Sequence, residues 1–318
     1  MAHRFTNLDP NHRPHGRWEI LRWGITDRLR GRRRPRPPGL PAPIVGPDFD
    51  LLQSRSSQPW LTWLGHASFL GSLGGHRFLI DPVLSAHAGW LYRRHLPPPL
   101  TIDQIPTVSA VLVTHNHYDH LDIGLIRALP AELPVVVPDG MGRWMEKNGR
   151  HHVIELQWWQ EAEVGDLRVT LVPACHWSRR GVFDTNRVLW GGYVVKGGGN
   201  SVYHSGDTAS FNGFGEIGRR FPKLDAAMLP IGGYEPAWFM EPYHLNPEQA
   251  GRAFLQTGAR RLVPMHWGSF QLTDESLCEP ADRMRSWWLS EDPGEDKSLD
   301  LLAVGETLLM AETWVDRK

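Results

Sequence analysis

Short apolar runs separated by polar and glycine-containing segments dominate the chain from residue 58 onward. Runs of this kind, bounded by Gly, Pro, Asn or Asp, predict buried β-strands. The predicted strands span residues 61–70, 77–80, 108–114, 134–137, 167–172, 189–195, 201–204, 226–229 and 261–263. We expect a turn over residues 71–75 to join the first two, because three of these five residues are glycine.

Helices are predicted between these strands. They span residues 121–129, 140–149, 212–220, 247–257 and 281–289. The fourth has the clearest start, with Asn246 as the N-cap, Pro247 in the first helical position and Glu248 in the first turn. Strands that dominate and are interrupted by helices predict an α/β domain built in layers.

The first part of the chain has a different character. Residues 1–40 hold ten Arg and three acidic residues, although the whole chain has a net charge of only −1. The basic stretch Arg32–Arg34 runs into prolines that block helices and strand pairing. Residues 18–25 could form one or two helical turns. We therefore expect a basic, Pro-rich arm over residues 1–45 and a folded domain over residues 46–318. The arm is either a solvated linker or a segment attracted to anionic lipid or nucleic acid.

Length and composition narrow the class of protein. The 318 residues are 41% hydrophobic and 22% charged, values typical of a soluble globular protein with a large core. Two cysteines imply no disulfide framework and favour a reducing compartment. The sequence shows neither a secretory signal nor an apolar run long enough to span a membrane. The expected location is cytoplasmic, with peripheral contact at the inner membrane face as an option that the basic arm leaves open.

The hexapeptide from His115 to His120 carries the strongest chemical signal. His115, His117, Asp119 and His120 follow directly on the predicted strand at 108–114. Imidazoles are the commonest metal ligands in proteins, and a carboxylate adds an anionic oxygen. The hexapeptide therefore predicts a metal site where a strand ends and a loop begins.

Further candidate ligands follow other predicted strands. His176, Asp207 and His266 each come shortly after an apolar run, and Gly206 would allow close approach of the backbone beside Asp207. Five His and two Asp are too many for one four-coordinate ion and suit two. We assign the first ion to the set His115, His117 and His176, the second to the set Asp119, His120 and His266, and the bridging position to Asp207. Each ion then keeps room for a shared hydroxide.

Several segments together carry a family resemblance. They are the hexapeptide, Trp63-Leu64-Gly65-His66-Ala67-Ser68, Asp81-Pro82, Ser205-Gly206-Asp207-Thr208, Pro230-Ile231-Gly232-Gly233-Tyr234-Glu235-Pro236 and His266-Trp267-Gly268. Over roughly residues 58–275 the chain resembles the metallo-β-lactamase superfamily, and in it the branch of N-acylphosphatidylethanolamine-hydrolysing phospholipase D. The resemblance implies an αββα sandwich: two mixed β-sheets packed face to face, with helices outside.

The resemblance also implies an activity. It places the seven ligands at the positions of two Zn²⁺ ions, although imidazoles and carboxylates also suit iron or manganese. It implies cleavage of N-acylphosphatidylethanolamine-like lipids to phosphatidic acid and an N-acylethanolamine, with a metal-bridging hydroxide attacking phosphorus. Asp119, Asp207 and His244 are the expected catalytic residues. His244 matches a family histidine near the substrate phosphate; on chemistry alone it could be only a residue before a helix.

Other residues have two interpretations each. His66 and Asp81 either orient the metal ligands or simply shape turns. Tyr234, Trp238 and Trp267 are candidate substrate-binding residues, because a lipid needs an apolar wall, but aromatic residues are more often core.

Alternative functions use the same ligands. A lactonase or esterase acting on a small, soluble, even phosphorylated substrate would need only a different pocket. A nuclease would draw on the basic arm, but the near-neutral pI of about 7.0 and the acidic remainder of the chain argue against a nucleic-acid partner. A non-catalytic binding module is disfavoured, because such members usually lose ligands. The sequence does not indicate the oligomeric state.

Overall fold

The central strands of this protein are buried on both faces. The computed structural model describes residues 4–10, 12, 14–31, 36–54, 57–90 and 92–310, so the predicted basic stretch Arg32–Arg34 lies outside the described residues. Every residue of β1 (Trp60–Gly65) and β2 (Ser68–Leu73) is buried. Successive side chains alternate between two apolar clusters on opposite sides of the sheet, as Leu61 and Leu64 do. This explains why the strands are continuous apolar runs.

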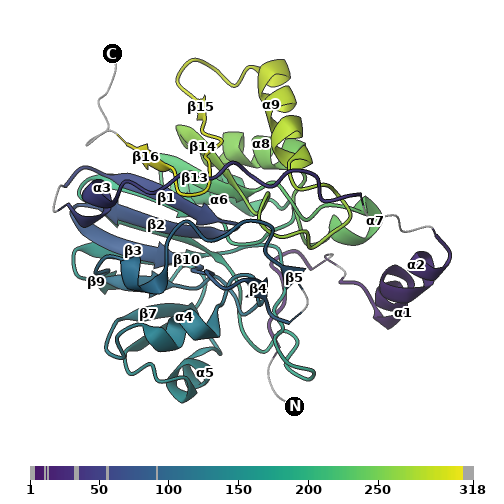
Figure 1. The fold of residues 1–318 in the computed structure, drawn as a ribbon, viewed down its shortest axis with the longest axis horizontal. Coiled ribbons are helices and arrows are strands. Elements are labelled where there is room, and N and C mark those ends of the chain that lie inside the picture. The colour runs from purple at the N-terminus through teal and green to yellow at the C-terminus, as the bar shows by residue number, and fades with distance from the viewer. Residues whose placement is uncertain are drawn as a thin grey trace.

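Two seven-stranded mixed sheets form the centre of the fold, as Figure 1 shows. The first has the order β16-β1-β2-β3-β6-β7-β8, and the second has the order β15-β14-β13-β12-β11-β10-β9. The further strands of the first sheet are β3 (His76–Ile80), β6 (Ala110–Leu112), β7 (Val135–Pro138), β8 (Val153–Leu156) and β16 (Thr307–Leu309). Those of the second are β9 (Glu161–Val164), β10 (Leu167–Val172), β11 (Gly192–Gly197), β12 (Asn200–His204), β13 (Ala226–Pro230), β14 (Arg261–Met265) and β15 (Ser298–Leu299). A separate hairpin pairs β4 (His87–Ala88) with β5 (Tyr92–Arg93).

Helices cover the outer faces of both sheets. The helices are α1 (Arg17–Leu21), the π-helical turn η1 (Arg22–Thr26), α2 (Asp27–Leu29), α3 (Phe49–Gln53), the 3₁₀ turn η2 (Ile102–Gln104), α4 (Ile123–Ala128), α5 (Gly142–Lys147), α6 (Gly213–Arg220), α7 (Ala237–Met240), α8 (Pro247–Thr257) and α9 (Glu279–Glu291). Residues of α4 and α5 share a cluster with the first sheet, and residues of α6, α8 and α9 share one with the second. The predicted αββα sandwich is confirmed. In the described ranges no helix combines the length and apolar character needed to cross a membrane.

The two sheets pack through large aromatic side chains. Phe69 and Phe78 of the first sheet meet Tyr193 and Tyr203 of the second in one fully buried cluster. Burial of such a side chain contributes about 2–3 kcal/mol. The Tyr193 hydroxyl donates across the core to the carbonyl of Val113, at 3.0 Å. This bond ties the second sheet to the chain just before the hexapeptide.

Strand direction explains why the candidate ligands meet. In the second sheet β12, β13 and β14 are parallel, and β10 runs in the same direction because it is antiparallel to β11, which is antiparallel to β12. In the first sheet β3 and β6 are parallel. The carboxyl ends of these strands lead into the segments that carry the predicted ligands. Parallel strands present such ends at one edge, where α/β proteins commonly place their sites.

The first predicted strand is wrong in one respect. Residues 61–70 form parts of two strands, β1 and β2, with a turn at His66 and Ala67, whereas the turn before β3 is confined to residues 74–75. The turn needs unusual backbone, because Gly65 has φ 97° and His66 has φ 54°. The polar residues at this turn, His66 and Ser68, are themselves fully buried, so they do not mark a solvent-exposed loop. The predicted start of α8 is confirmed, because Asn246 caps the helix and Pro247 begins it.

Candidate metal centre

The side chains of seven predicted ligands converge where the strand ends meet. The hexapeptide follows β6, His176 follows β10, Asp207 follows β12 and His266 follows β14. One oxygen is the hub of the cluster. Asp207 Oδ2 lies within 4.0 Å of a ring nitrogen of five histidines: His115 (3.9 Å), His120 (3.2 Å), His176 (3.7 Å), His244 (4.0 Å) and His266 (3.3 Å). A carboxylate with so many imidazoles around it has the geometry expected of a bridging ligand.

Two adjacent groups of donor atoms, with no residue in common, lie around this hub. The first group comprises His115, His117, His176 and Asp207, and the second comprises His66, Asp119, His120 and His266. Within each group the donor atoms lie within 4.8 Å of one another, so each could hold a metal ion. The histidines and Asp119 fall into the two sets predicted for two ions, with His66 added to the second, whereas Asp207, the predicted bridge, belongs to the first group. A third group joins His244 to Asp207 and His266.

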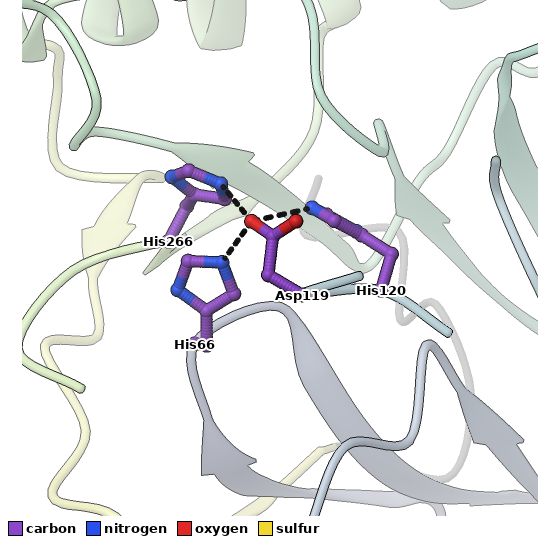
Figure 2. A group of neighbouring side chains, drawn as sticks. All are labelled: His66, Asp119, His120 and His266. Atoms are coloured by element: carbon purple, nitrogen blue, oxygen red, sulfur yellow. Dashed lines mark hydrogen bonds and ion pairs between the residues drawn. The ribbon is translucent and has the colours of Figure 1, made fainter. Parts of the chain in front are cut away.

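Figure 2 shows how the second group is arranged. His66, His120 and His266 approach Asp119 from three sides, with ring nitrogens 2.9, 3.7 and 3.5 Å from Asp119 Oδ2. His66 is fully buried in the turn between β1 and β2, and its ring lies 4.0 Å from that of His266. The structure thus brings His66 to the cluster itself, rather than leaving it in a remote turn.

Hydrogen bonds set the tautomers of three histidines. His120 Nδ1 donates to Asp81 Oδ2 at 2.7 Å, and His176 Nδ1 donates to the Tyr243 carbonyl at 2.9 Å. His115 Nδ1 lies 3.0 Å from Thr114 Oγ1, whose proton goes to Asp81. Each ring therefore turns the lone pair of Nε2 toward the cluster, as a metal-binding histidine does.

Unsatisfied polar atoms show that the cluster fits a cation. His120 Nε2, His266 Nε2 and Asp207 Oδ1 are buried and find no hydrogen-bond partner within the described part of the chain. Leaving such atoms unpaired costs about 1–3 kcal/mol each. Lone pairs that face one another across a few ångströms are the donor set that a divalent ion requires. The residues present therefore fit the metal ions that the family resemblance implies.

The charge balance of the cluster points the same way. Burial lowers the pKa of His176 to about 3 and that of His117 to about 4, which keeps both rings neutral. Burial opposes ionisation of Asp207, but His120 and His266 outweigh it and hold its pKa well below the usual range. Burial also opposes protonation of His266, but Asp207 and Asp119 raise its pKa to about 9. Buried anionic carboxylates thus require positive charge, which a proton on His266 supplies in the absence of metal and which metal ions would supply in its place.

Strained backbone marks the same region. His66 (φ 54°), Asp81 (φ 43°) and His266 (φ 64°) all have left-handed conformations that non-glycine residues rarely adopt. Such strain persists only where surrounding structure enforces it, and it concentrates at functional sites. The predicted close approach at Gly206 is confirmed, because a Cβ there would lie 2.5 Å from the Gly191 carbonyl oxygen.

The predicted substrate-binding residues occupy different environments. The Tyr234 ring is buried and its hydroxyl donates to Glu279 Oε1 of α9 at 3.1 Å. Trp267 is buried in the core, stacked on Trp63 with ring centroids 5.3 Å apart. Trp238 of α7 is 39% exposed. The structure therefore accounts for Tyr234 and Trp267 through core contacts and leaves Trp238 at the surface.

His244 and Asp119 lie where the cluster opens to solvent. Their side chains keep 14% and 13% of their surface exposed, whereas those of His120, Asp207 and His266 keep 2% or less. Burial lowers the pKa of His244 to about 3, so its ring is neutral. A neutral imidazole at this opening can donate a hydrogen bond to a bound substrate.

Sequence reasoning missed Asn7. Its side-chain amide donates to the His176 carbonyl at 2.9 Å, and its Oδ1 accepts from the backbone N–H of His176 and from Trp190 Nε1. These contacts join positions 169 residues apart, and no local pattern marks them. The N-terminal segment thus supports a ligand-bearing loop, which the interpretation as an arm did not anticipate.

Asp81→Asn tests whether this buried residue orients His120. The Asp81 carboxylate accepts from Thr114 N, Thr114 Oγ1 and His120 Nδ1, and an amide cannot accept all three. We expect metal affinity, measured by competition with a chelator, to fall about 10- to 100-fold. The matched control is Asp122→Asn, because Asp122 is also buried but caps α4. Equal metal affinities in the two variants would assign Asp81 to the turn alone.

Comparison with known proteins adds independent findings. Residues 76–267 match the Beta-lactamase superfamily domain. An uncharacterised protein of Mycobacterium tuberculosis is 36% identical over 295 residues, covering 88% of this chain and 77% of that protein. The N-acyl-phosphatidylethanolamine-hydrolyzing phospholipase D 1 of Caenorhabditis elegans is 33% identical over 263 residues, covering 77% and 74%.

Two further similarities concern hydrolases. A UPF0173 metal-dependent hydrolase of Koribacter versatilis is 33% identical over 216 residues, covering 66% of this chain and 84% of that protein. Among solved structures, an isothiocyanate hydrolase from Delia radicum gut bacteria superposes with a TM-score of 0.65 at 22% identity, covering 79% of this chain and 100% of that one. The structural likeness supports the fold.

Proposed function

The chain belongs to the metallo-β-lactamase superfamily of metal-dependent hydrolases, and on that premise we propose that it is a phospholipase D-type phosphodiesterase. The proposed substrates are N-acylphosphatidylethanolamine-like lipids. The proposed cofactor is a pair of Zn²⁺ ions. The observation that carries the proposal is the convergence of two donor groups on Asp207 Oδ2, since two adjacent ions suit the displacement of an alkoxide from phosphorus.

The substrate class is supported by the relatives. The Caenorhabditis elegans relative is named for hydrolysis of N-acyl-phosphatidylethanolamine, and its similarity extends over 77% of this chain. A yeast relative of the same name is 34% identical over 70% of this chain. The family match over residues 76–267 includes every predicted ligand position.

The chain's own residues have defined parts in the proposed reaction. His115, His117 and His176 would hold one ion, Asp119, His120 and His266 the other, and Asp207 would bridge them. When bound, the ions would supply a water-derived nucleophile at neutral pH and positive charge opposite the phosphoryl oxygens. In the overall reaction an oxygen of water joins phosphorus, the bond from phosphorus to the ethanolamine oxygen breaks, and that oxygen leaves with a proton.

His244 is the proposed contact to the phosphoryl group. Its Nδ1 is buried without a hydrogen-bond partner among the described residues and lies 4.0 Å from Asp207 Oδ2. It therefore faces the space next to the proposed ions. A donor placed there would bind a phosphoryl oxygen or assist departure of the leaving group.

A direct comparison of substrates tests the proposed function. Protein loaded with zinc is incubated with vesicles containing N-acylphosphatidylethanolamine and, separately, with a panel of lactones and small esters. We expect N-acylethanolamine and phosphatidic acid to accumulate, as measured by mass spectrometry, and chelator treatment to stop their release. Parallel loading with iron or manganese identifies the metal that supports turnover.

Hydrolysis of lactones in place of the lipid would contradict the proposed substrate class. Rapid hydrolysis of lactones with intact lipid would assign the same metal centre to a small soluble substrate. Loss of lipid hydrolysis on chelation, restored by added metal, separates a metal-dependent reaction from contamination by another lipase.

A further inference from the structure

The helical stretch over residues 17–29 exposes an apolar stripe. Trp18 is 80% exposed, Leu21 41%, Ile25 53% and Leu29 83%. Their spacing of three, four and four residues puts them along one side of a helix. Large apolar side chains exposed singly are common, but four aligned along one helix are a mark of an interaction surface.

The other side of this helix faces the protein. The Trp23 ring stacks on Phe239 of α7 with centroids 4.7 Å apart, and Asp27 is buried, accepting from Arg22 Nε at 3.2 Å. The Arg22 guanidinium lies 4.3 Å from the centre of the Trp238 ring. Figure 1 shows α1 and α2 projecting from the two sheets beside α7. The orientation of the stripe is therefore fixed by contacts on the opposite side.

Positive charge accompanies the stripe. Arg28 and Arg30 are exposed within or directly after the helix, and the first 40 residues hold ten Arg against three acids. The remainder of the chain is acidic, so the basic character is concentrated in the first 40 residues, which include the helix. An amphipathic helix with Trp and Leu on one side and Arg nearby is the pattern that lies in the headgroup region of a bilayer.

The segment before the helix connects it to the metal centre. His15 stacks on Phe239 at 4.5 Å and its backbone N–H donates to the Tyr243 hydroxyl at 2.6 Å. Asn7, earlier in the segment, contacts both backbone groups of His176. The helix is thus held next to the segment that carries His244.

We propose that the exposed stripe Trp18, Leu21, Ile25 and Leu29, with its flanking arginines, docks this protein on an anionic phospholipid surface. The charge of the segment favours anionic lipid over a zwitterionic surface, and the exposed Trp and Leu supply the apolar contact. The docking proposal depends only on the helix. The identity of the lipid that the docked protein would cleave depends on the proposed function.

Flotation with vesicles tests the docking. The full chain is mixed with vesicles of phosphatidylcholine alone or with phosphatidylglycerol, and the bound fraction is measured. We expect strong binding only to the anionic vesicles, weakened by salt. Replacing both Trp18 and Leu29 with serine is expected to weaken binding at least about tenfold, given the apolar area lost. Arg28→Ala and Arg30→Ala are each expected to weaken it about fivefold.

The matched control is Leu289→Ser on α9. Leu289 is 83% exposed, as Leu29 is, but belongs to a helix on the outer face of the second sheet. The Leu289→Ser variant should bind vesicles as the wild type does. Equal binding by wild type and the Trp18/Leu29 variant would overturn the proposal, as would equal losses in that variant and the control. A concentration-dependent dimer that the Trp18/Leu29 variant abolishes would assign the stripe to a second copy and overturn it too.

Activity measurements separate docking from the proposed function. The Trp18/Leu29 variant should hydrolyse a soluble phosphodiester, such as bis(p-nitrophenyl) phosphate, at the wild-type rate, because both changes are on exposed side chains outside the metal centre. A matching drop in this rate would overturn the assignment of the stripe to docking alone. Vesicle binding by wild type without lipid hydrolysis would support the docking surface and contradict only the proposed substrate.

Discussion

Asp207→Ala is expected to abolish hydrolysis and to lower the metal content of the purified protein. Five imidazoles, including members of both donor groups, lie within 4.0 Å of Asp207 Oδ2, so removal of this carboxylate takes away the oxygen that faces both groups. The loss of turnover should exceed the roughly 10²- to 10³-fold cost of removing one charge-stabilising group. Steady-state kinetics and metal analysis of the same preparation measure the two effects.

A second buried aspartate provides the control for this variant. Asp225 lies beside the start of β12, where it accepts from Ser201 N at 2.8 Å, whereas Asp207 follows the end of the same strand. The two are 4% and 3% exposed. Asp225→Ala should lower the free energy of unfolding and leave the metal content unchanged. Retained turnover in Asp207→Ala, or equal loss of metal in both variants, would contradict the dinuclear assignment.

The convergence of the candidate ligands could be predicted from the sequence because its signal is local. The hexapeptide puts four candidate ligands directly after one apolar run, and His176, Asp207 and His266 each follow another. Strand ends of the same direction meet at one edge of a sheet, so adjacency in space follows once the strands are recognised. The strands themselves are recognisable because a core between two sheets requires continuous apolar runs.

The turn at His66 was not predictable by the same reasoning. Residues 61–70 are all buried, the polar His66 and Ser68 included, because one face packs against the second sheet and the other against helices. Nothing in the alternation of side chains marks the reversal. The turn depends on the left-handed backbone of Gly65 and His66. A glycine followed by a histidine does not by itself predict that conformation.

Contacts across long stretches of chain were also beyond sequence reasoning. The basic composition of residues 1–45 suggested a linker or a surface wrap, and the division into an arm and a catalytic domain stays a prediction. Composition says nothing about which side chain will meet a partner far along the chain. Asn7 meets His176, which follows β10, across 169 positions of the chain, and this contact depends on the folded structure alone. Aromatic residues pose a similar difficulty, since Trp238 and Trp267 look alike in sequence and differ in burial.

His244→Ala is expected to lower the rate of phosphodiester hydrolysis about 10²- to 10⁴-fold while leaving the metal content unchanged. The size follows from loss of a positioned proton donor or of a hydrogen bond to the phosphoryl group. His244 belongs to a possible ligand group with Asp207 and His266, so a role as a ligand is the competing interpretation. Its Nδ1 is 4.0 Å from Asp207 Oδ2, farther than the nitrogens of His120 and His266.

Metal affinity decides between these two roles. If His244 contacts substrate, competition with a chelator gives the wild-type affinity and the whole effect falls on turnover or on substrate binding. If it is a ligand, the affinity falls with the activity, and added metal restores part of the rate. His266→Ala is the matched comparison, because that ring contacts both Asp119 and Asp207 and its loss should lower metal affinity. If both variants lose metal affinity to the same extent, His244 is a metal ligand and not a contact to the substrate.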